Sequence, residues 1–194
     1  MAVAALTLAF VAHASTHART KAAIASLGVY ARTCRWFVTI APECTHHDRR
    51  DARGEPQPCD LSTFLERGWC RLENLARMSM GPAGMFNYAG GDVLQYTGDD
   101  DEMVRVLVQV FQGQFTVESD KERLVPVMIG LWFFLLQARF MGSLLKHVDY
   151  DEKVFQLICD NKDDVFPDKY FGRKIALVEG LVAEHHERLT SGQH

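Results

Sequence analysis

The run WFVTIAP, from Trp36 to Pro42, limits the fold more than any other stretch of this chain. It is nearly all apolar or β-branched and stops at a proline, so it predicts a strand buried on both faces. The segment before this strand predicts a helix that starts near Thr20. Apolar side chains recur there at helical spacing, at Ile24, Leu27, Ala31 and Cys34. A helix that leads directly into a buried strand is typical of an α/β sheet.

The first fourteen residues, MAVAALTLAFVAHA, contain no formally charged side chain and allow two interpretations. One is the apolar part of a signal peptide that ends in a small-x-small cleavage site at residues 12–14. The other is a buried first strand, which we favour because no Lys or Arg precedes the apolar run. Strand, helix and strand in this order predict an α/β fold with a short, mostly parallel sheet and a right-handed crossover.

The composition favours a globular protein of the cytoplasm. With 194 residues, 47% of them hydrophobic, the chain can bury a full core. Its net charge of -4 gives no overall basic field, so nucleic acid is not an expected partner. The five cysteines are odd in number and form no C-x-x-C pair. This cysteine usage argues against a disulfide framework and indicates a reducing compartment.

The second long apolar run, Leu124 to Leu136, predicts a buried helix and no membrane span. It is broken by Gln137 and Arg139 after 13 residues, whereas a span needs ~20.

The helical pattern continues to the end of the chain. Ser119 and Glu122 form a capping box ahead of the apolar run, and the sequence after the run predicts two more helices. We find no internal repeat and no linker. The prediction is therefore a single domain over residues 1–194, with an α/β part at 20–117 and a helical C-terminal third at 118–194.

Between the first strand and the helical third, the chain reads as a loop, a helix and a strand. The polar segment from Glu43 to Asp60 predicts a surface loop. Thr63 and Glu66 match the S/T-x-x-E capping box, which would start a helix that a GPAG turn ends near Met78. The next pattern, VRVLVQV, alternates valines at 104, 106, 108 and 110 and predicts a strand with period two.

The helix FLERGWCRLENLARM carries the candidate site, and its side chains sort into three stripes. The apolar stripe is Leu65, Trp69, Leu72 and Ala76, the second is Glu66, Cys70, Glu73 and Arg77, and the third is Arg67, Arg71, Asn74 and Met78. Packing explains only the first stripe. Gly68 costs ~1 kcal/mol relative to alanine inside a helix, which indicates that another group approaches the backbone there.

Glu73 and Cys70 each allow a structural and a chemical reading. Glu73 could form an exposed ion pair with Arg77, or it could be a cleft carboxylate that stabilises a developing cation or orients a ribose hydroxyl. Cys70 lies near Arg67 and Arg71 in the first turns of the helix, conditions that lower the pKa of a thiol. Because no histidine has a defined spacing to Cys70, we favour a structural thiol.

Metal and cofactor motifs are weak or missing. Zinc ligands could come from one polar segment, at Cys44, His46, His47, Asp48 and Cys59, but the knuckle spacing of two to four residues between cysteines is absent. The acidic cluster from Asp99 to Glu102 is better read as a solvated loop than as a metal site. Neither G-x-x-x-x-G-K-S/T nor G-x-G-x-x-G occurs, so no metal and no cofactor are expected.

The residues Trp69, Cys70 and Glu73 resemble the W-C-x-x-E signature in the third helix of TIR domains. The resemblance covers about Thr20 to Met80 and implies a flavodoxin/TIR-like fold. In NAD-cleaving members of that family the glutamate is catalytic. The resemblance therefore implies Glu73 as a candidate catalytic residue, with Trp69 packing beneath the site and NAD as substrate. The serine- or glycine-rich nucleotide loop of that family has no match before Thr20.

The segment RGWCRLE also looks like a group of algal and protist proteins that share it. Taken together, these patterns predict a TIR-like protein-interaction or signalling module without established catalysis, which binds a protein partner or self-associates. The alternative is an NAD glycohydrolase that cleaves the nicotinamide ribosyl bond with Glu73. A third hypothesis is a degenerate domain that acts only as a scaffold.

Overall fold

The structure is a computed structural model that describes residues 26, 29–81, 83–97, 101–145 and 152–192. The signal peptide or first strand expected in the first fourteen residues, and the start of the helix expected near Thr20, lie outside the described residues. The end of that helix is described. Residues 29–33 are helical and lead into the first described strand, as the sequence predicts.

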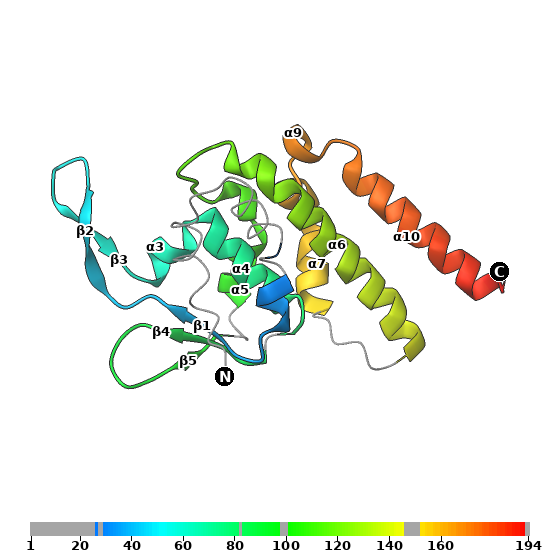
Figure 1. The fold of residues 1–194 in the computed structure, drawn as a ribbon, viewed down its shortest axis with the longest axis horizontal. Helices are drawn as coiled ribbons and strands as arrows, with labels where there is room; N and C mark the ends of the chain where they lie inside the picture. Colours follow the sequence, from blue (N-terminus) through cyan, green and yellow to red (C-terminus); the bar gives the residue numbers. More distant parts are fainter. Residues whose placement is uncertain (1–25, 27–28, 82, 98–100, 146–151, 193–194) are drawn as a thin grey trace.

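A small three-stranded sheet forms the α/β part (Figure 1). β1 (Phe37–Ile40) pairs in parallel with β4 (Met85–Tyr88), and β5 (Gln95–Tyr96) pairs antiparallel with the other edge of β4. The helix α4 (Gly68–Met78) lies between β1 and β4 in the chain. The parallel β1–β4 pair confirms the α/β class, while β5 makes the described sheet mixed.

Residues 43–60, predicted to be a surface loop, instead contain a β-hairpin. β2 (Cys44–Arg50) pairs antiparallel with β3 (Pro56–Cys59) in a separate two-stranded sheet, which projects from the left of the molecule in Figure 1. The loop prediction was wrong because most hairpin positions whose burial is described are exposed, including Cys44, Arg50 and Pro58. Exposed strands need no apolar face, so their composition resembles that of a loop.

The helix predicted across Phe64 to Met78 is two helices. α3 (Leu61–Leu65) begins after Asp60, whose Oδ1 accepts a 2.8 Å hydrogen bond from the Thr63 backbone N–H. The Thr63 hydroxyl accepts in return from the Asp60 N–H at 2.9 Å. The capping box is thus Asp60 with Thr63, not Thr63 with Glu66. The chain becomes extended at Arg67, and α4 begins at Gly68.

The strand predicted from alternating valines is a helix, α5 (Asp101–Val108), followed by the short 3₁₀ helix η2 (Val110–Gln112). The buried side chains are Met103, Val104, Leu107 and Val108, which are neighbours one helical turn apart. Leu107 is fully buried between two of the valines, so burial follows helical periodicity and not alternation. Within the acidic cluster, residues 101 and 102 start α5 and do not lie in a loop.

The C-terminal third is helical, as predicted. Its helices are α6 (Asp120–Leu145), α7 (Glu152–Asp160), α8 (Lys162–Val165), α9 (Asp168–Phe171) and α10 (Lys174–Ser191). The two helices expected after the apolar run correspond to α7 and α10, and two short helices separate them. α10 packs beside α6 at the right of Figure 1.

The long helix α6 supplies much of the core. Six of its side chains join the main hydrophobic cluster: Leu124, Val125, Met128, Leu131, Trp132 and Leu135. The other side is open, and Phe133 is 46% exposed. By length and composition alone, residues 120–142 would suffice to cross a membrane, and 39% of their most apolar window is buried. The buried helix predicted from the sequence is therefore buried on one side only.

Candidate functional site

The helix α4 lies at the centre of the α/β part and is buried on nearly all sides. Its buried residues are Gly68, Cys70, Leu72, Asn74, Leu75, Ala76, Arg77 and Met78. The three predicted stripes do not describe this helix, because members of the second and third stripes are as buried as those of the apolar stripe. Two polar residues in that set, Asn74 and Arg77, form side-chain hydrogen bonds within the protein.

Asn74 joins α4 to the sheet. The Thr39 hydroxyl donates to Asn74 Oδ1 at 3.3 Å, and Asn74 Nδ2 donates to the Cys70 carbonyl at 2.9 Å. Thr39 and Asn74 are 7% and 3% exposed, so this polar contact is dry. Buried hydrogen bonds of this kind fix the position of a helix against a strand because an unpaired group would cost 1–3 kcal/mol.

Glu73, the predicted catalytic residue, has an unusual environment. The residue is partly buried, but its Oε1 is fully buried and no group of the described residues hydrogen-bonds to it. Burial raises the pKa of the Glu73 carboxyl to about 7, and the positive charge of Arg67 partly offsets that rise. A carboxyl that titrates near neutral pH can act as an acid, a base or a stabiliser of positive charge.

The ion pair considered between Glu73 and Arg77 is not present. The Arg77 Nη1 donates to the Gly81 carbonyl at 2.9 Å, and Nη2 donates to the Ala83 carbonyl. Arg77 is 6% exposed, so its guanidinium fastens the turn after α4 from inside the protein. The pair was proposed from i,i+4 spacing, but carbonyls of the turn that follows the helix bind the guanidinium instead.

Cys70 is a structural thiol, which the sequence reading favoured. It is fully buried, and this burial raises the pKa of the Cys70 thiol to about 12 despite the opposing charge of Arg67. The expected lowering by nearby arginines is therefore outweighed by desolvation. A thiol that stays protonated at neutral pH is a poor nucleophile.

Trp69 and Gly68 pack against the segment after η2. The Trp69 and Phe115 rings make an edge contact with centroids 6.2 Å apart. A β-carbon at Gly68 would lie 1.9 Å from Phe115 Cζ, and the Gly68 N–H donates to the Gln114 carbonyl at 3.0 Å. The predicted close approach at Gly68 is confirmed. Trp69 is a packing residue, and its place beneath a nucleotide stays a prediction.

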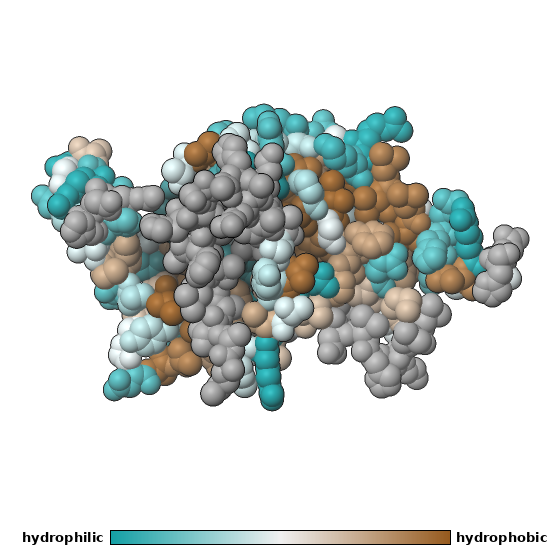
Figure 2. Space-filling view, viewed as in Figure 1, coloured by the Kyte–Doolittle hydropathy of each residue, from teal (hydrophilic) through white to brown (hydrophobic). Residues whose placement is uncertain are grey.

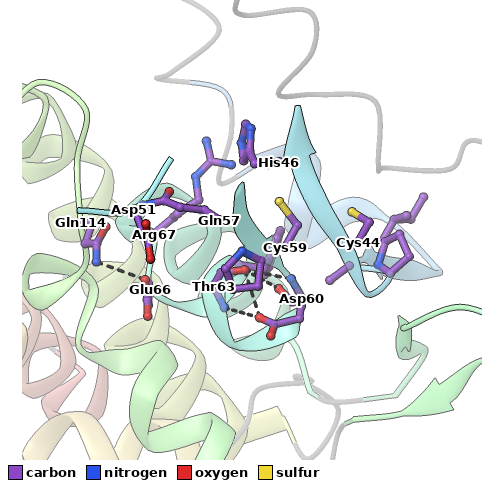
Figure 3. Close-up of a pocket in the computed structure, with 15 residues that line it drawn as sticks. Cys44, His46, Asp51, Gln57, Cys59, Asp60, Thr63, Glu66, Arg67 and Gln114 are labelled. Carbon is purple, nitrogen blue, oxygen red and sulfur yellow. Dashed lines mark hydrogen bonds between the residues drawn. The ribbon is translucent and has the colours of Figure 1, made fainter. Parts of the chain in front are cut away.

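A cleft of about 490 Å³ lies between the hairpin, α3 and the start of α4 (Figure 3). It opens beside the carboxyl end of β1, and its polar lining includes His46, Asp60, Glu66, Arg67 and Gln114. Gln114 donates to Glu66 at 3.2 Å across its floor. Glu73 is not among the lining residues, so the structure does not bring the candidate catalytic carboxyl and this cleft together.

The structure assembles no metal site from the zinc ligands considered in the sequence, as far as its described side chains show; those of His47 and Asp48 lie outside the description. Within the described residues, no group of three or more histidine, cysteine, aspartate or glutamate side chains could hold a metal ion. Cys44 and Cys59 do come together, as partners across the hairpin. The sequence could not show this, because the pairing depends on a hairpin that was not predicted.

The sheet has an open face, which the sequence reading missed. Val38 and Ile40 of β1 align with Phe86 and Tyr88 of β4 on the side away from α4. Phe86 lies between the rings of Trp36 and Tyr96, with centroids 5.8 and 5.9 Å away. Trp36, Ile40 and Tyr96 are 50%, 52% and 48% exposed. The strand predicted to be buried on both faces is buried on one.

Comparison of the chain with protein-family models, curated proteins and solved structures finds no match. The geometry of the chain itself therefore carries the functional argument. Two features stand out: the open sheet face with the edge of β1, and the buried carboxyl of Glu73.

Proposed function

We propose that this chain is a TIR-like protein-interaction module that self-associates through the edge of β1. The observation that carries the proposal is an apolar strand edge, between two opposite charges, with which no described strand pairs. No described strand pairs with the outer edge of β1. Exposed apolar strand edges are templates for pairing with another chain unless they are covered or charged.

The backbone directions identify the available groups. The N–H groups of Phe37 and Ala41 donate toward β4, to the carbonyls of Gly84 and Tyr88. Because successive residues of a strand point their backbone groups to opposite edges, Val38 and Ile40 present theirs to the outer edge. In an antiparallel pair centred on Thr39, Val38 of one copy exchanges hydrogen bonds with Ile40 of the other.

Charge complementarity favours a second copy as the partner. Arg35 and Glu43 are both exposed, and each lies four residues from Thr39. The same centred register therefore brings Arg35 of one copy opposite Glu43 of the other, and the two-fold axis repeats the contact. A self-complementary patch of this kind is what a two-fold interface requires. The pairing would also join two open aromatic faces into one continuous surface.

Sedimentation of the purified chain over a range of concentrations tests this proposal. Wild type should self-associate. Arg35→Glu should raise the dissociation constant about tenfold, since two like-charge contacts cost roughly 1–2 kcal/mol together. The charge-swapped double variant Arg35→Glu with Glu43→Arg should restore the wild-type constant. Arg53→Glu, at an exposed position of the hairpin turn, is the matched control.

A second apolar surface is the alternative site of self-association. Figure 2 shows hydrophobic side chains over the α6 and α10 side of the molecule, where Phe133, Leu177 and Leu181 are exposed. If Leu181→Ser abolishes association and Arg35→Glu does not, the helices and not β1 form the interface. A chain that stays monomeric at every concentration overturns the proposal altogether.

NAD cleavage is a second candidate, favoured by the environment of Glu73. A desolvated carboxylate whose buried Oε1 accepts no hydrogen bond from the described residues would stabilise the oxocarbenium-like state that forms as neutral nicotinamide leaves. Nicotinamide release should increase as the pH rises through about 7, where the Glu73 carboxyl loses its proton. Release should disappear in Glu73→Gln and persist in Glu66→Gln, which changes a carboxyl of the cleft instead. No release above a blank excludes this activity.

A further inference from the structure

The hairpin places two thiols directly opposite each other. Cys44 is the first residue of β2, Cys59 is the last residue of β3, and the two are partners in the antiparallel register. Partners in such a ladder have Cα atoms about 4.5–5.5 Å apart and side chains on the same face. The Cα atoms of two disulfide-bonded cysteines are about 4.4–6.8 Å apart, so this separation allows a disulfide. In the structure both residues are thiols.

The other three cysteines have no comparable neighbour. Cys34 lies just after the helical residues 29–33, where its thiol donates to the Tyr30 carbonyl. Cys70 is buried in α4, and Cys159 is exposed on α7. None of the three lies in a strand of the described sheets, so none is held opposite another cysteine as Cys44 and Cys59 are.

The two paired thiols differ in access. Cys44 is exposed and Cys59 is only partly so, and both line the cleft beneath the hairpin (Figure 3). An oxidant that enters from solvent therefore reaches Cys44 first. Cys59, held opposite, is in position to react with the oxidised sulfur before a second oxidant molecule arrives.

We infer that Cys44 and Cys59 form a reversible dithiol–disulfide site, oxidised by a hydroperoxide and restored by a thiol reductant. The Cys44 thiolate attacks the peroxide, the O–O bond breaks, and Cys44 becomes a sulfenic acid as the peroxide is reduced to an alcohol or to water. The Cys59 thiolate then attacks the Cys44 sulfur, the S–O bond breaks and water leaves. Two thiols lose two electrons, the peroxide gains them, and the thiol protons end on the oxygen products.

A bond at this position would stiffen one wall of the cleft. β2 follows β1 across Pro42, and β3 leads directly into Asp60, which caps α3. The disulfide would tie the exit of β1 to the entrance of α3, and His46 and Gln57, which line the same wall, lie two residues from the bridge toward the hairpin turn. Oxidation would thus restrain the wall of the cleft that the hairpin forms.

Peptide mapping of the full chain after hydrogen peroxide treatment tests the inference. Trypsin can cut after Arg50 and Arg53, which are exposed and lie between the two cysteines. Nicked wild-type chain should therefore remain one piece without reductant and separate into two pieces with it. The linked peptide should be Cys44–Cys59, and it should be lost in Cys44→Ser and Cys59→Ser but retained in Cys159→Ser.

Dimedone labelling tests which of the two cysteines is oxidised first. In Cys59→Ser, dimedone should trap a sulfenic acid at Cys44, whereas in Cys44→Ser the dimedone adduct at Cys59 should be much weaker. Cross-links that instead join Cys34 or Cys159 to a hairpin cysteine overturn the pairing. Accumulation of sulfinic acid at Cys44 in wild type, with no linked peptide, overturns the reversible site even if the thiol is reactive.

Discussion

The ring of Phe115 lies against Gly68 so closely that a β-carbon at this glycine would come within 1.9 Å of Cζ. Gly68→Ala must therefore displace the ring or the start of α4, and we expect it to lower the free energy of unfolding by about 1–3 kcal/mol. Urea denaturation measures this change. The matched control is Gly180→Ala in α10, where a β-carbon meets nothing within 4 Å. That change should stabilise the protein by up to ~1 kcal/mol.

A smaller side chain at position 115 should also relieve the contact between Phe115 and Gly68. In a Phe115→Leu background the shorter side chain leaves room near Gly68, so adding Gly68→Ala should cost less than it does in wild type. A cost that is equal in both backgrounds would mean that Phe115 is not the group that requires glycine here.

This contact illustrates what a sequence pattern can and cannot give. A glycine inside a helical pattern predicted that another group approaches Gly68, although not that the group is Phe115. The division of the same helix into one buried stripe and two others was wrong. Helical periodicity identifies the buried side chains only when another face of the helix meets water. α4 is covered on nearly all sides, and its polar residues Asn74 and Arg77 find partners that are distant or beyond the helix end.

Two other misreadings share one cause. Alternating valines predicted a strand where α5 forms, and polar composition predicted a loop where the hairpin forms. Both predictions rested on which side chains are apolar. The sequence pattern does not show which side chains are buried by tertiary contacts. At α5, Leu107 is buried between the valines, so the pattern of burial fits a helix and not a strand. At residues 43–60, the two strands pair with each other although they bury few side chains. The alignment of Cys44 with Cys59 depends on that pairing and was likewise out of reach.

Glu73 should make the protein less stable as the pH rises. Its pKa is about 7 in the folded chain and about 4.3 when unfolded, so between these values the folded state binds more protons. Stability from this group is fully present below about pH 4 and is lost as the pH rises through about 7. Glu73→Gln should therefore stabilise the protein at pH 8, by at most about 4 kcal/mol, and change little near pH 4.

Urea denaturation at both pH values measures this difference. Glu187→Gln, at an exposed position of α10, is the control and should leave the pH dependence unchanged. If Glu73→Gln and wild type lose stability equally between pH 4 and pH 8, the Glu73 carboxyl is not desolvated in solution.

Arg77 and Glu73 should act independently on stability. Arg77→Met leaves the carbonyls of Gly81 and Ala83 without their donors. Because Gly81 is only partly buried and Ala83 is exposed, water can reach these carbonyls, and we expect a loss of about 1 kcal/mol for each hydrogen bond. Arg77→Lys should recover part of this loss, because an ammonium cannot reach both carbonyls as the guanidinium fork does. In a double-mutant cycle with Glu73→Gln, the effects should add within about 0.5 kcal/mol. A larger favourable coupling would show that the two side chains form the ion pair absent from the structure.

Glu179 should hold the C-terminal helix to the core. Its Oε1 accepts from Trp132 Nε1 of α6 at 3.1 Å, and its carboxylate pairs with Lys162 of α8 at 2.6 Å. Trp132 is 2% exposed, so Glu179→Ala leaves a buried indole N–H unpaired and should destabilise the protein by about 1–3 kcal/mol. Glu179→Gln keeps an acceptor and should cost less, because the pair with Lys162 is partly exposed and contributes about 1 kcal/mol or less.

Glu184→Ala gives the matched comparison on the same helix. Glu184 pairs with Arg188 at an exposed site and touches no buried donor, so its removal should change stability by less than about 0.5 kcal/mol. Equal effects of Glu179→Ala and Glu184→Ala in urea denaturation would show that the indole does not depend on Glu179. A large effect of Glu179→Ala with a small effect of Glu179→Gln would place the stabilisation in the hydrogen bond to Trp132 and not in the charge.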